Sequence, residues 1–405
     1  MNKVNDDYKF LKRNILKYYL SQFLFGIQFT APIFILFLLA NDLTLTEIAI
    51  LGSLQAILIG FFEIPSGVLA DFFGRKRVLI FAGFMALFGA TVYSISHSFY
   101  TFLIADVFYA LALSFKSGSD VSWIYDTLKN LKLENKFKRI KGKGDLINAV
   151  ALFLSQGSIT IFLVKDYRTY FILMIPITLL IVITIFSYRE PAIHLTKDIK
   201  IKREFKTHLI NSFKIIKNNH FLSYIFLFLI LESIIGSAYY FLLLQPYLEI
   251  IKYPLTLFGL LWAVTGLLTG IGSYFSDPIE SIVGKRFIIY TAPIIIFLPI
   301  LFLGLTHSII PALCLILFAQ FTIGIYYVVF EDYINKEISS DKRATILSSK
   351  NFFRYIAWGA LGPLIGYIAD KFSINYTFLI LGVSGLVISY LTILIFRPFY
   401  HPHST

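Results

Sequence analysis

A row of chemically active side chains lies within one long apolar stretch of the chain. Steps of three, four, three and four residues separate Asp106, Tyr109, Leu113, Lys116 and Asp120. This spacing places all five on one face of a helix. An ionisable group inside a membrane costs ~2.5–3.5 kcal/mol and usually faces a partner or a watery cavity, so the row could bind a polar solute or move a proton. Lys116 and Asp120, four residues apart, could instead simply neutralise each other, and both interpretations stay open.

A second candidate is Glu232, near the middle of another apolar stretch and without a cation on its own helix. A buried carboxyl group whose protonation equilibrium lies near neutral pH can load and release a proton. Glu232 is therefore the first candidate for proton coupling, and a hydrogen-bonded acid that only packs helices is the alternative. Glu63, in the sequence E-I-P-S-G, lies closer to the cytoplasmic end of its stretch. We assign it to a gate, and a place in the substrate site is the alternative.

Further polar and aromatic side chains in the apolar stretches are candidates for the wall of a substrate cavity. Aromatic walls with a few amides suit amphipathic organic molecules or cations. Because Phe and Tyr are so frequent in this chain, ordinary helix packing is the alternative for most of them. These candidates are Gln22, Gln28, Gln156, Tyr239, Tyr240, Gln320, Tyr326, Tyr327 and Trp358.

The composition requires most of the chain to lie in lipid. Hydrophobic residues make up 57% and charged residues 15%, with 42 Phe and a mean hydropathy of +0.74, unlike a soluble domain. The net charge of +12 does not indicate nucleic acid, because the bases gather in short segments between apolar stretches, as cytoplasmic loops do. The single cysteine, Cys314, excludes an internal disulfide.

Twelve apolar stretches are long enough to cross a bilayer as helices. The first, 15–40, is too long for the core of a cleaved signal peptide. The sequence thus predicts an all-α polytopic membrane protein with two pseudo-symmetric six-helix bundles, at 1–187 and 220–405, joined by a cytoplasmic linker at 188–219. Both termini would be cytoplasmic. The other spans are expected at about 46–70, 77–96, 99–127, 144–164, 168–187, 220–247, 255–281, 286–306, 308–335, 344–369 and 375–396.

Residues 67–79, between the second and third spans, read G-V-L-A-D-F-F-G-R-K-R-V-L. The adjacent bases predict a short cytoplasmic loop. The segment resembles the signature between the second and third helices of the major facilitator superfamily, although Phe72 stands where that family usually has a base. A degenerate second copy, with Gly272, Asp277, Gly284, Lys285 and Arg286, follows the eighth span. The matches to the signature are Gly67, Leu69, Ala70, Asp71, Gly74, Arg75, Lys76 and Leu79.

This resemblance implies a transporter whose two halves rock about a central site. It would place the first, fourth, seventh and tenth helices around the cavity, with the Asp106 to Asp120 row facing it. Asp71 would face the start of the eleventh helix, where the helix dipole favours an anion, as a latch made in one state and broken in the other. Cytoplasmic gate pairs are expected between Asp126 and Arg75 or Arg139, and between Asp332 and Arg343.

The sequence predicts a secondary transporter of a small organic solute and not an enzyme. It has no phosphate-binding loop for ATP, no H-E-x-x-H, no G-x-S-x-G and no cluster of His and Cys, so we expect no cofactor and no metal. Proton-coupled efflux of amphipathic, drug-like compounds is the first hypothesis. Import of a small metabolite by proton symport is the alternative, because the fifth span lacks the glycine-proline motif associated with many drug:proton antiporters. Asp106 also lies about where many proton-coupled members of the family carry an arginine, for which Lys116 is the nearest basic substitute.

A different class, a non-transporting membrane receptor or a lipid scramblase, would show no saturable solute flux. The expected partners are a small-molecule substrate, protons and membrane lipids, without nucleic acid. We expect a monomer in the cell membrane.

Overall fold

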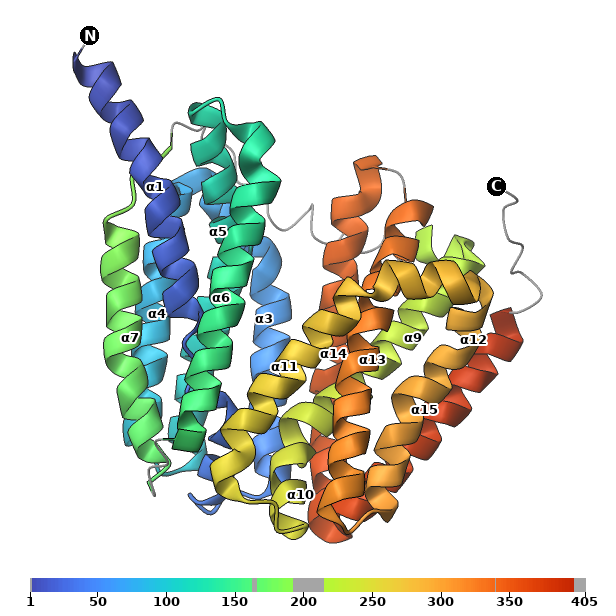
Figure 1. Cartoon of the computed structure of the whole chain (residues 1–405). Coiled ribbons are helices and arrows are strands. Elements are labelled where there is room, and N and C mark those ends of the chain that lie inside the picture. The colour runs from blue at the N-terminus through green and yellow to red at the C-terminus, as the bar shows by residue number, and fades with distance from the viewer. Residues whose placement is uncertain (1, 162–165, 192–214, 339, 397–405) are drawn as a thin grey trace. The chain divides into compact units, whose positions relative to one another are not determined.

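Long helices make up nearly all of the described chain (Figure 1). The computed structural model describes residues 2–161, 166–191, 215–338 and 340–396, and these contain no strand. Among them, eleven helical segments are long and apolar enough to span a membrane. The remaining long helix, α14 (Ser340–Lys371), has 32 residues and carries Lys350 and Arg354 inside it. The predicted all-α fold with twelve long helical segments is confirmed.

The helices follow the predicted spans with local differences. In the first part of the chain they are α1 (Asn2–Gly26), η1 (Ala31–Ile33), α2 (Phe34–Leu39), α3 (Leu45–Phe73), α4 (Arg75–Ile95), α5 (Phe99–Asn130), η2 (Glu134–Lys136), α6 (Phe137–Ile161) and α7 (Arg168–Phe186). In the second part they are α9 (His220–Ser237), η3 (Ala238–Leu243), α10 (Leu244–Ile250), η4 (Leu255–Leu257), α11 (Phe258–Tyr274), α12 (Ser276–Leu305), α13 (Ile309–Glu337), α14 and α15 (Ile374–Phe396).

Two predicted spans are wrong in detail. The first was expected as one helix over 15–40, but α1 ends at Gly26 and helix resumes at Ala31. Pro32 lies at the start of the new turn, where its missing N–H costs nothing. The eighth was expected to reach residue 281, but α11 ends at Tyr274.

Two glycines mark equivalent turns in the two parts of the chain. Gly74 precedes α4 with a φ of 95°, and Gly284 bends α12 with a φ of 80°. Only glycine adopts this backbone conformation without strain. Gly284 belongs to the degenerate second copy of the 67–79 segment, so the weak sequence echo coincides with a repeated backbone feature.

The seventh span contains a π-helical segment, η3, between α9 and α10. Pro246, in α10, has no backbone N–H for the carbonyl one turn earlier, and a wider turn before it is one way to accommodate that loss. Such segments are frequent at functional sites. This one carries Tyr239 and Tyr240, both proposed above as cavity residues.

Two compact units emerge from the packing. Unit 1 comprises Met1–Phe37, Leu54–Lys202 and Phe258–Leu260, and unit 2 comprises Leu38–Ser53, Arg203–Leu257 and Leu261–Thr405. In unit 1, α4 packs on α5 and α7, and α1 packs on α6; in unit 2, α12 packs on α13 and α15, and α9 packs on α14. The same pairing in both units fits an internal repeat. Most of the predicted linker lies outside the described residues, so the predicted domain limits stay a prediction.

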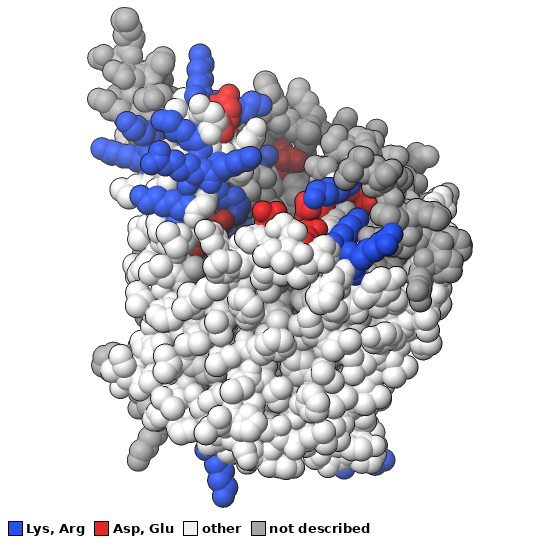
Figure 2. Space-filling model, turned by 45° about the vertical axis from the view of Figure 1, so that its right-hand side comes forward, with Lys and Arg blue, Asp and Glu red and all other residues white. Residues whose placement is uncertain are grey.

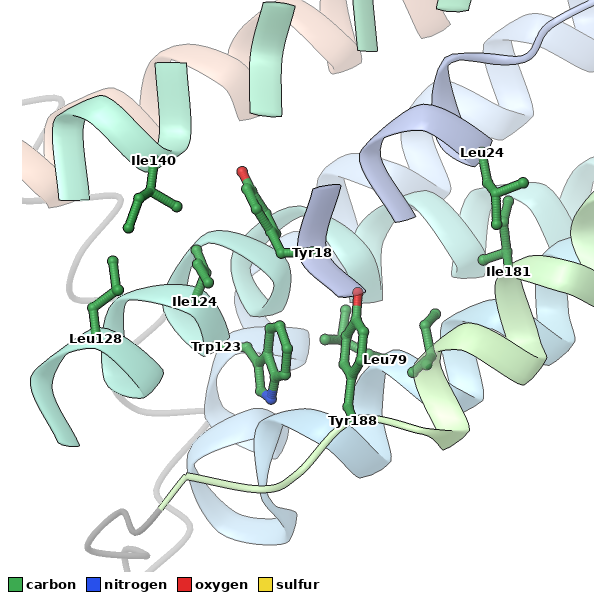
Figure 3. Packing of buried hydrophobic residues seen from close by; sticks show 10 residues of the cluster. Tyr18, Leu24, Leu79, Trp123, Ile124, Leu128, Ile140, Ile181 and Tyr188 are labelled. Carbon is green, nitrogen blue, oxygen red and sulfur yellow. The ribbon is translucent and has the colours of Figure 1, made fainter. Parts of the chain in front are cut away.

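The core of unit 1 contains one large aromatic stack. The Trp123 ring lies 3.8 Å from that of Tyr188, at 11° to it, and both are buried. Burial also raises the pKa of the Tyr188 hydroxyl. Figure 3 shows the apolar side chains around this stack. They come from α1, α4, α5, α6 and α7: Tyr18, Leu24, Leu79, Ile124, Leu128, Ile140, Ile181 and Ile185.

Candidate functional site

The turn between α3 and α4 is held by a carboxylate that the sequence did not indicate. Glu190, after α7, accepts hydrogen bonds from the backbone N–H groups of Arg75 and Lys76, each at 3.0 Å. It therefore satisfies two donors at the start of α4, where the helix dipole favours an anion. Burial raises the pKa of Glu190, and the two hydrogen bonds oppose that shift.

Arg75 joins two predicted gate carboxylates. Its Nε lies 2.9 Å from Oδ2 of Asp126, and one of its terminal nitrogens lies 3.7 Å from Asp71. Arg139, the alternative partner of Asp126, is exposed on α6. Asp71 is also largely exposed. The structure thus brings Asp71, Arg75 and Asp126 together within unit 1.

The other predicted gate residues are more scattered. Asp332 forms a salt bridge with Lys336 at 2.5 Å, while the side chain of Arg343, its expected partner, lies outside the described residues. Glu63 is half-buried on α3, and its backbone carbonyl accepts from the Ser66 hydroxyl at 2.8 Å. Lys76 and Gly67 are half-buried as well.

The row on α5 divides into two groups that contact different helices. At one end, Asp106 accepts hydrogen bonds from the Tyr93 hydroxyl at 2.6 Å and from Nε2 of Gln55 at 3.0 Å. Tyr109 lies directly against Gly89 of α4, where an added Cβ would be 2.9 Å from the ring. Asp106 is therefore buried among uncharged donors.

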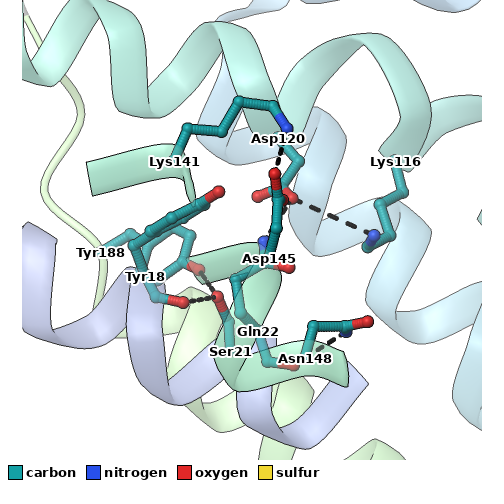
Figure 4. A network of polar contacts seen from close by, with 9 residues as sticks. All are labelled: Tyr18, Ser21, Gln22, Lys116, Asp120, Lys141, Asp145, Asn148 and Tyr188. Carbon is teal, nitrogen blue, oxygen red and sulfur yellow. Dashed lines mark hydrogen bonds and ion pairs between the residues drawn. The ribbon is translucent and has the colours of Figure 1, made fainter. Parts of the chain in front are cut away.

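At the other end of the row, Asp120 belongs to a polar network (Figure 4). Gln22 of α1 donates to Asp120 at 2.8 Å, while Lys116 lies 4.0 Å from the same oxygen. The Lys116 ammonium also lies 4.2 Å from the centre of the Phe25 ring, close enough for a cation–π contact. The expected neutralisation exists, but the shortest contact of Asp120 is to an amide on a different helix. Asn148 of α6 in turn donates to the Gln22 carbonyl at 2.9 Å.

Unit 2 contains two charge pairs that share α14. Nη2 of Arg354 lies 3.4 Å from Glu232 of α9, and Nζ of Lys350 lies 2.7 Å from Glu331 of α13. Lys350 and Arg354 are four residues apart, so they lie on one helix face. Sequence reasoning missed both cations. Their four-residue spacing inside the eleventh span was the signal that could have revealed them.

The remaining cavity candidates make ordinary contacts within their units. Three of them hydrogen-bond to threonines of unit 2: Tyr240 to Thr265 at 3.4 Å, Gln320 to Thr269 at 3.2 Å and Tyr326 to Thr291 at 3.1 Å. Tyr239 is fully buried and Trp358 nearly so. The backbone N–H of Gln28 donates to the Ser155 hydroxyl at 3.0 Å. In the described part of the chain, no group of three His, Cys, Asp or Glu could hold a metal ion.

A second carboxylate caps a helix start in unit 2. Asp370, near the end of α14, accepts from the backbone N–H groups of Leu45 and Thr46 at 3.0 and 2.7 Å, and from the Thr46 hydroxyl at 2.5 Å. Gly366 permits this approach, because a Cβ there would lie 2.6 Å from the Leu45 carbonyl oxygen. The first nine residues of α3 belong to unit 2 through these contacts, while the rest of α3 belongs to unit 1.

Long apolar helices, a repeated packing pattern and charge pairs inside the spans define a polytopic membrane protein. The family model of the Major Facilitator Superfamily matches residues 18–363, and the chain belongs to that superfamily. It is therefore a multi-pass membrane protein of a transporter family.

Individual relatives are more distant. The uncharacterized MFS-type transporter YxaM of Bacillus subtilis (strain 168) is 29% identical over 143 residues, which are 35% of this chain and 34% of that protein. The chain thus matches about a third of that relative.

Solved structures share the fold at low sequence identity. The nucleoside transporter NupG has a TM-score of 0.78 at 13% identity, covering 97% of this chain and 100% of that one. A D-xylose-proton symporter has a TM-score of 0.70 at 13% identity, covering 95% and 97%. These likenesses show the fold alone.

Proposed function

We propose that this transporter couples proton movement to the passage of a small organic solute by alternating access, and that Glu232 and Arg354 form the coupling pair. The observation that carries this proposal is their 3.4 Å contact between α9 and α14. Glu232 is the thirteenth residue of a 31-residue span, His220–Ile250, so it lies close to the middle of that span. Ionisable groups at such depth usually serve substrate or ion pathways.

Protonation of Glu232 would remove the charge that holds Arg354. Breaking a buried ion pair costs about 3–5 kcal/mol, and the partial exposure of both side chains lowers that figure here. A difference of about 1.4 kcal/mol already changes the ratio of two conformations tenfold. One proton at this pair is thus enough to favour one state of the transport cycle.

Efflux of amphipathic, drug-like compounds in exchange for protons is the leading form of this function. Its support is the density of aromatic side chains along α9 and η3, where Tyr240 lies 5.7 Å from Trp262 between ring centres. Aromatic surfaces bind amphipathic molecules and cations. Import of a small metabolite together with protons is the second candidate. The absence of a glycine-proline motif in the fifth span favours it.

The proposed cycle uses Asp71, Arg75 and Asp126 as a gate at the cytoplasmic end. We further propose that the two halves, 1–187 and 220–405, move about a site between the spans, in a monomer located in the cell membrane with both termini in the cytoplasm. Figure 2 shows most Lys and Arg of the displayed face gathered at one end, which supports this orientation.

Proteoliposomes with a trapped pH dye test the coupling. A pH gradient is imposed, and amphipathic cations, neutral drugs and small metabolites are added in turn. Proton flux against the added amphiphile, lost in Glu232→Gln and kept in the control Glu249→Gln, would support antiport through Glu232. Glu249 is an exposed residue of α10, so its substitution matches the change in chemistry at a site outside the pair.

The other outcomes are equally informative. If protons move only together with a metabolite and in the same direction, the result would support symport in place of efflux. Coupled flux that persists at the wild-type rate in Glu232→Gln would overturn the role of the Glu232–Arg354 pair.

A further inference from the structure

Helix α1 presents an exposed face that changes character along its length. Lys12 and Arg13 are exposed near its middle. Leu16 and Leu20 follow one and two turns later, with 72% and 49% of their surface exposed, and Phe23 continues the row. The spacing places bases directly above apolar side chains on one helix face.

Helix α6 packs against α1 and presents the same sequence of side chains. Arg139 and Lys143 are exposed in its first turns, and Leu146, Val150 and Leu154 are exposed below them. These residues are separated by four, three, four and four positions, so they share a face. Nζ of Lys143 lies 5.1 Å from the centre of the Tyr19 ring of α1, so a base of the α6 face lies against α1.

The bases here exceed what neighbouring acids neutralise. Residues 129–143 contain seven Lys and Arg and a single acid, Glu134. Among the described residues, the salt bridge of this segment joins Lys141 to Asp145. By contrast, Lys336 and Lys350 of unit 2 are each paired with a carboxylate. Figure 2 shows Lys and Arg gathered at one end of the face it displays, above a band almost free of charge.

A general preference for bases on one side of a membrane explains their presence but not their concentration on one unit. An unbalanced basic cluster that continues into exposed apolar side chains has the chemistry of a phospholipid with an anionic headgroup. Arginine and lysine bind the phosphate, arginine with two parallel hydrogen bonds, and apolar side chains contact the acyl chains.

We propose that the face formed by α1 and α6 binds an anionic phospholipid of the adjacent leaflet. Its headgroup contacts Arg13, Arg139 and Lys143, and its acyl chains lie along Leu16 and Leu146. The site is separate from the Glu232–Arg354 pair and does not depend on the coupled ion or on the direction of transport.

The test uses the full-length protein in nanodiscs of phosphatidylcholine with up to about 30% phosphatidylglycerol, an anionic lipid. It measures the phosphatidylglycerol that co-purifies with the protein and the binding of a fluorescent phosphatidylglycerol. The double variant Arg139→Gln/Lys143→Gln should bind it roughly 10-fold more weakly. The control Lys129→Gln/Lys132→Gln removes the same charge from the same basic segment, at two positions outside the proposed headgroup contacts, and should bind within about twofold of wild type.

Three results would overturn the proposal. An equal loss in both double variants would show diffuse attraction to a charged surface instead of a site. Unchanged binding in Arg139→Gln/Lys143→Gln would exclude these bases. Displacement of the fluorescent lipid by inorganic phosphate or glycerol phosphate as readily as by the full lipid would show a site for free phosphate without acyl contacts. Leu146→Gln separates the acyl contribution: it should weaken lipid binding and leave competition by glycerol phosphate unchanged.

Discussion

Two helices of this transporter begin at a carboxylate from a distant part of the chain. Glu190 caps α4 through two backbone N–H groups, and Asp370 caps α3 through two backbone N–H groups and a hydroxyl. The chemistry is the same, since each carboxylate satisfies orphan donors at the positive end of a helix dipole. The two helices differ in how they belong to the compact units, and this difference suggests different roles for the two contacts during transport.

Glu190 and the whole of α4 lie in unit 1, so their contact need not change when the units move. The Asp370 contact involves α3, whose first nine residues belong to unit 2 and whose remainder belongs to unit 1. The Asp370 cap itself lies within unit 2, but it holds the end of a helix that is divided between the units, whereas α4 is not divided. We therefore expect the Glu190 cap to be permanent and the Asp370 cap to form and break during transport.

The largest effect is expected from Gly366→Ala. Its Cβ would lie 2.6 Å from the backbone oxygen of Leu45, and overpacking of this kind costs about 1–3 kcal/mol. The start of α3 should separate from α14. Cys314 is the single cysteine, so Cys314→Ser with Ser53→Cys provides one reporter thiol at a buried position. Its labelling rate should rise about 5- to 100-fold.

Gly266→Ala is the matched control for this experiment. Gly266 lies on α11, and a Cβ there would meet nothing within 4 Å. Equal labelling rates in the two glycine variants would mean that the α3–α14 contact does not limit opening.

A somewhat smaller effect is expected from Asp370→Asn. The amide keeps one acceptor but removes the charge and directs N–H hydrogens at backbone donors, so loss of the cap should cost about 0.5–2 kcal/mol. Labelling of the Ser53→Cys reporter should increase, while the neighbouring Lys371→Gln should leave it unchanged. If Asp370→Asn lowers the melting temperature but leaves the labelling rate of the Ser53→Cys thiol unchanged, the Asp370 cap is permanent. The two carboxylates would then have the same role.

Glu190→Gln should produce the opposite pattern. The expected cost, again about 0.5–2 kcal/mol, should appear as a lower melting temperature in detergent. The Ser53→Cys reporter should label at the wild-type rate, because the contact lies wholly within unit 1. Faster labelling in this variant would show that the start of α4 also takes part in opening.

The sequence predicted the features that depend on local signals. Apolar length located the spans, and the Gly74 to Lys76 pattern located the turn before α4. It did not reveal Glu190, Arg354 or Asp370, whose contacts join positions 115, 122 and 325 residues apart. Such contacts depend on which helix faces meet, and a carboxylate at a helix end looks the same in sequence whether it faces solvent or a distant N-terminus. The break after Gly26 was also missed, although Pro32 was a local signal for it.

The smallest expected effect is a pH dependence carried by Glu190. Burial raises the pKa of this carboxyl group above its ordinary value of 4.5, so the folded protein binds the proton more tightly than the unfolded chain does. Its contribution to stability is therefore fully present below the unfolded pKa and is lost as pH rises through the folded pKa. When the pH is lowered from 7 to 4.5, the melting temperature of the wild type should therefore rise relative to that of Glu190→Gln.

The sign of this shift separates two descriptions of the cap. If the two backbone hydrogen bonds outweighed burial, the ionised form would be favoured, and the wild type would lose stability relative to Glu190→Gln as the pH falls. Asp71→Asn, which alters a largely exposed carboxylate of the same turn, should follow the wild-type pH profile closely. A rise in melting temperature on acidification that occurs in the wild type and is absent from Glu190→Gln would show that the cap at α4 persists when Glu190 is protonated.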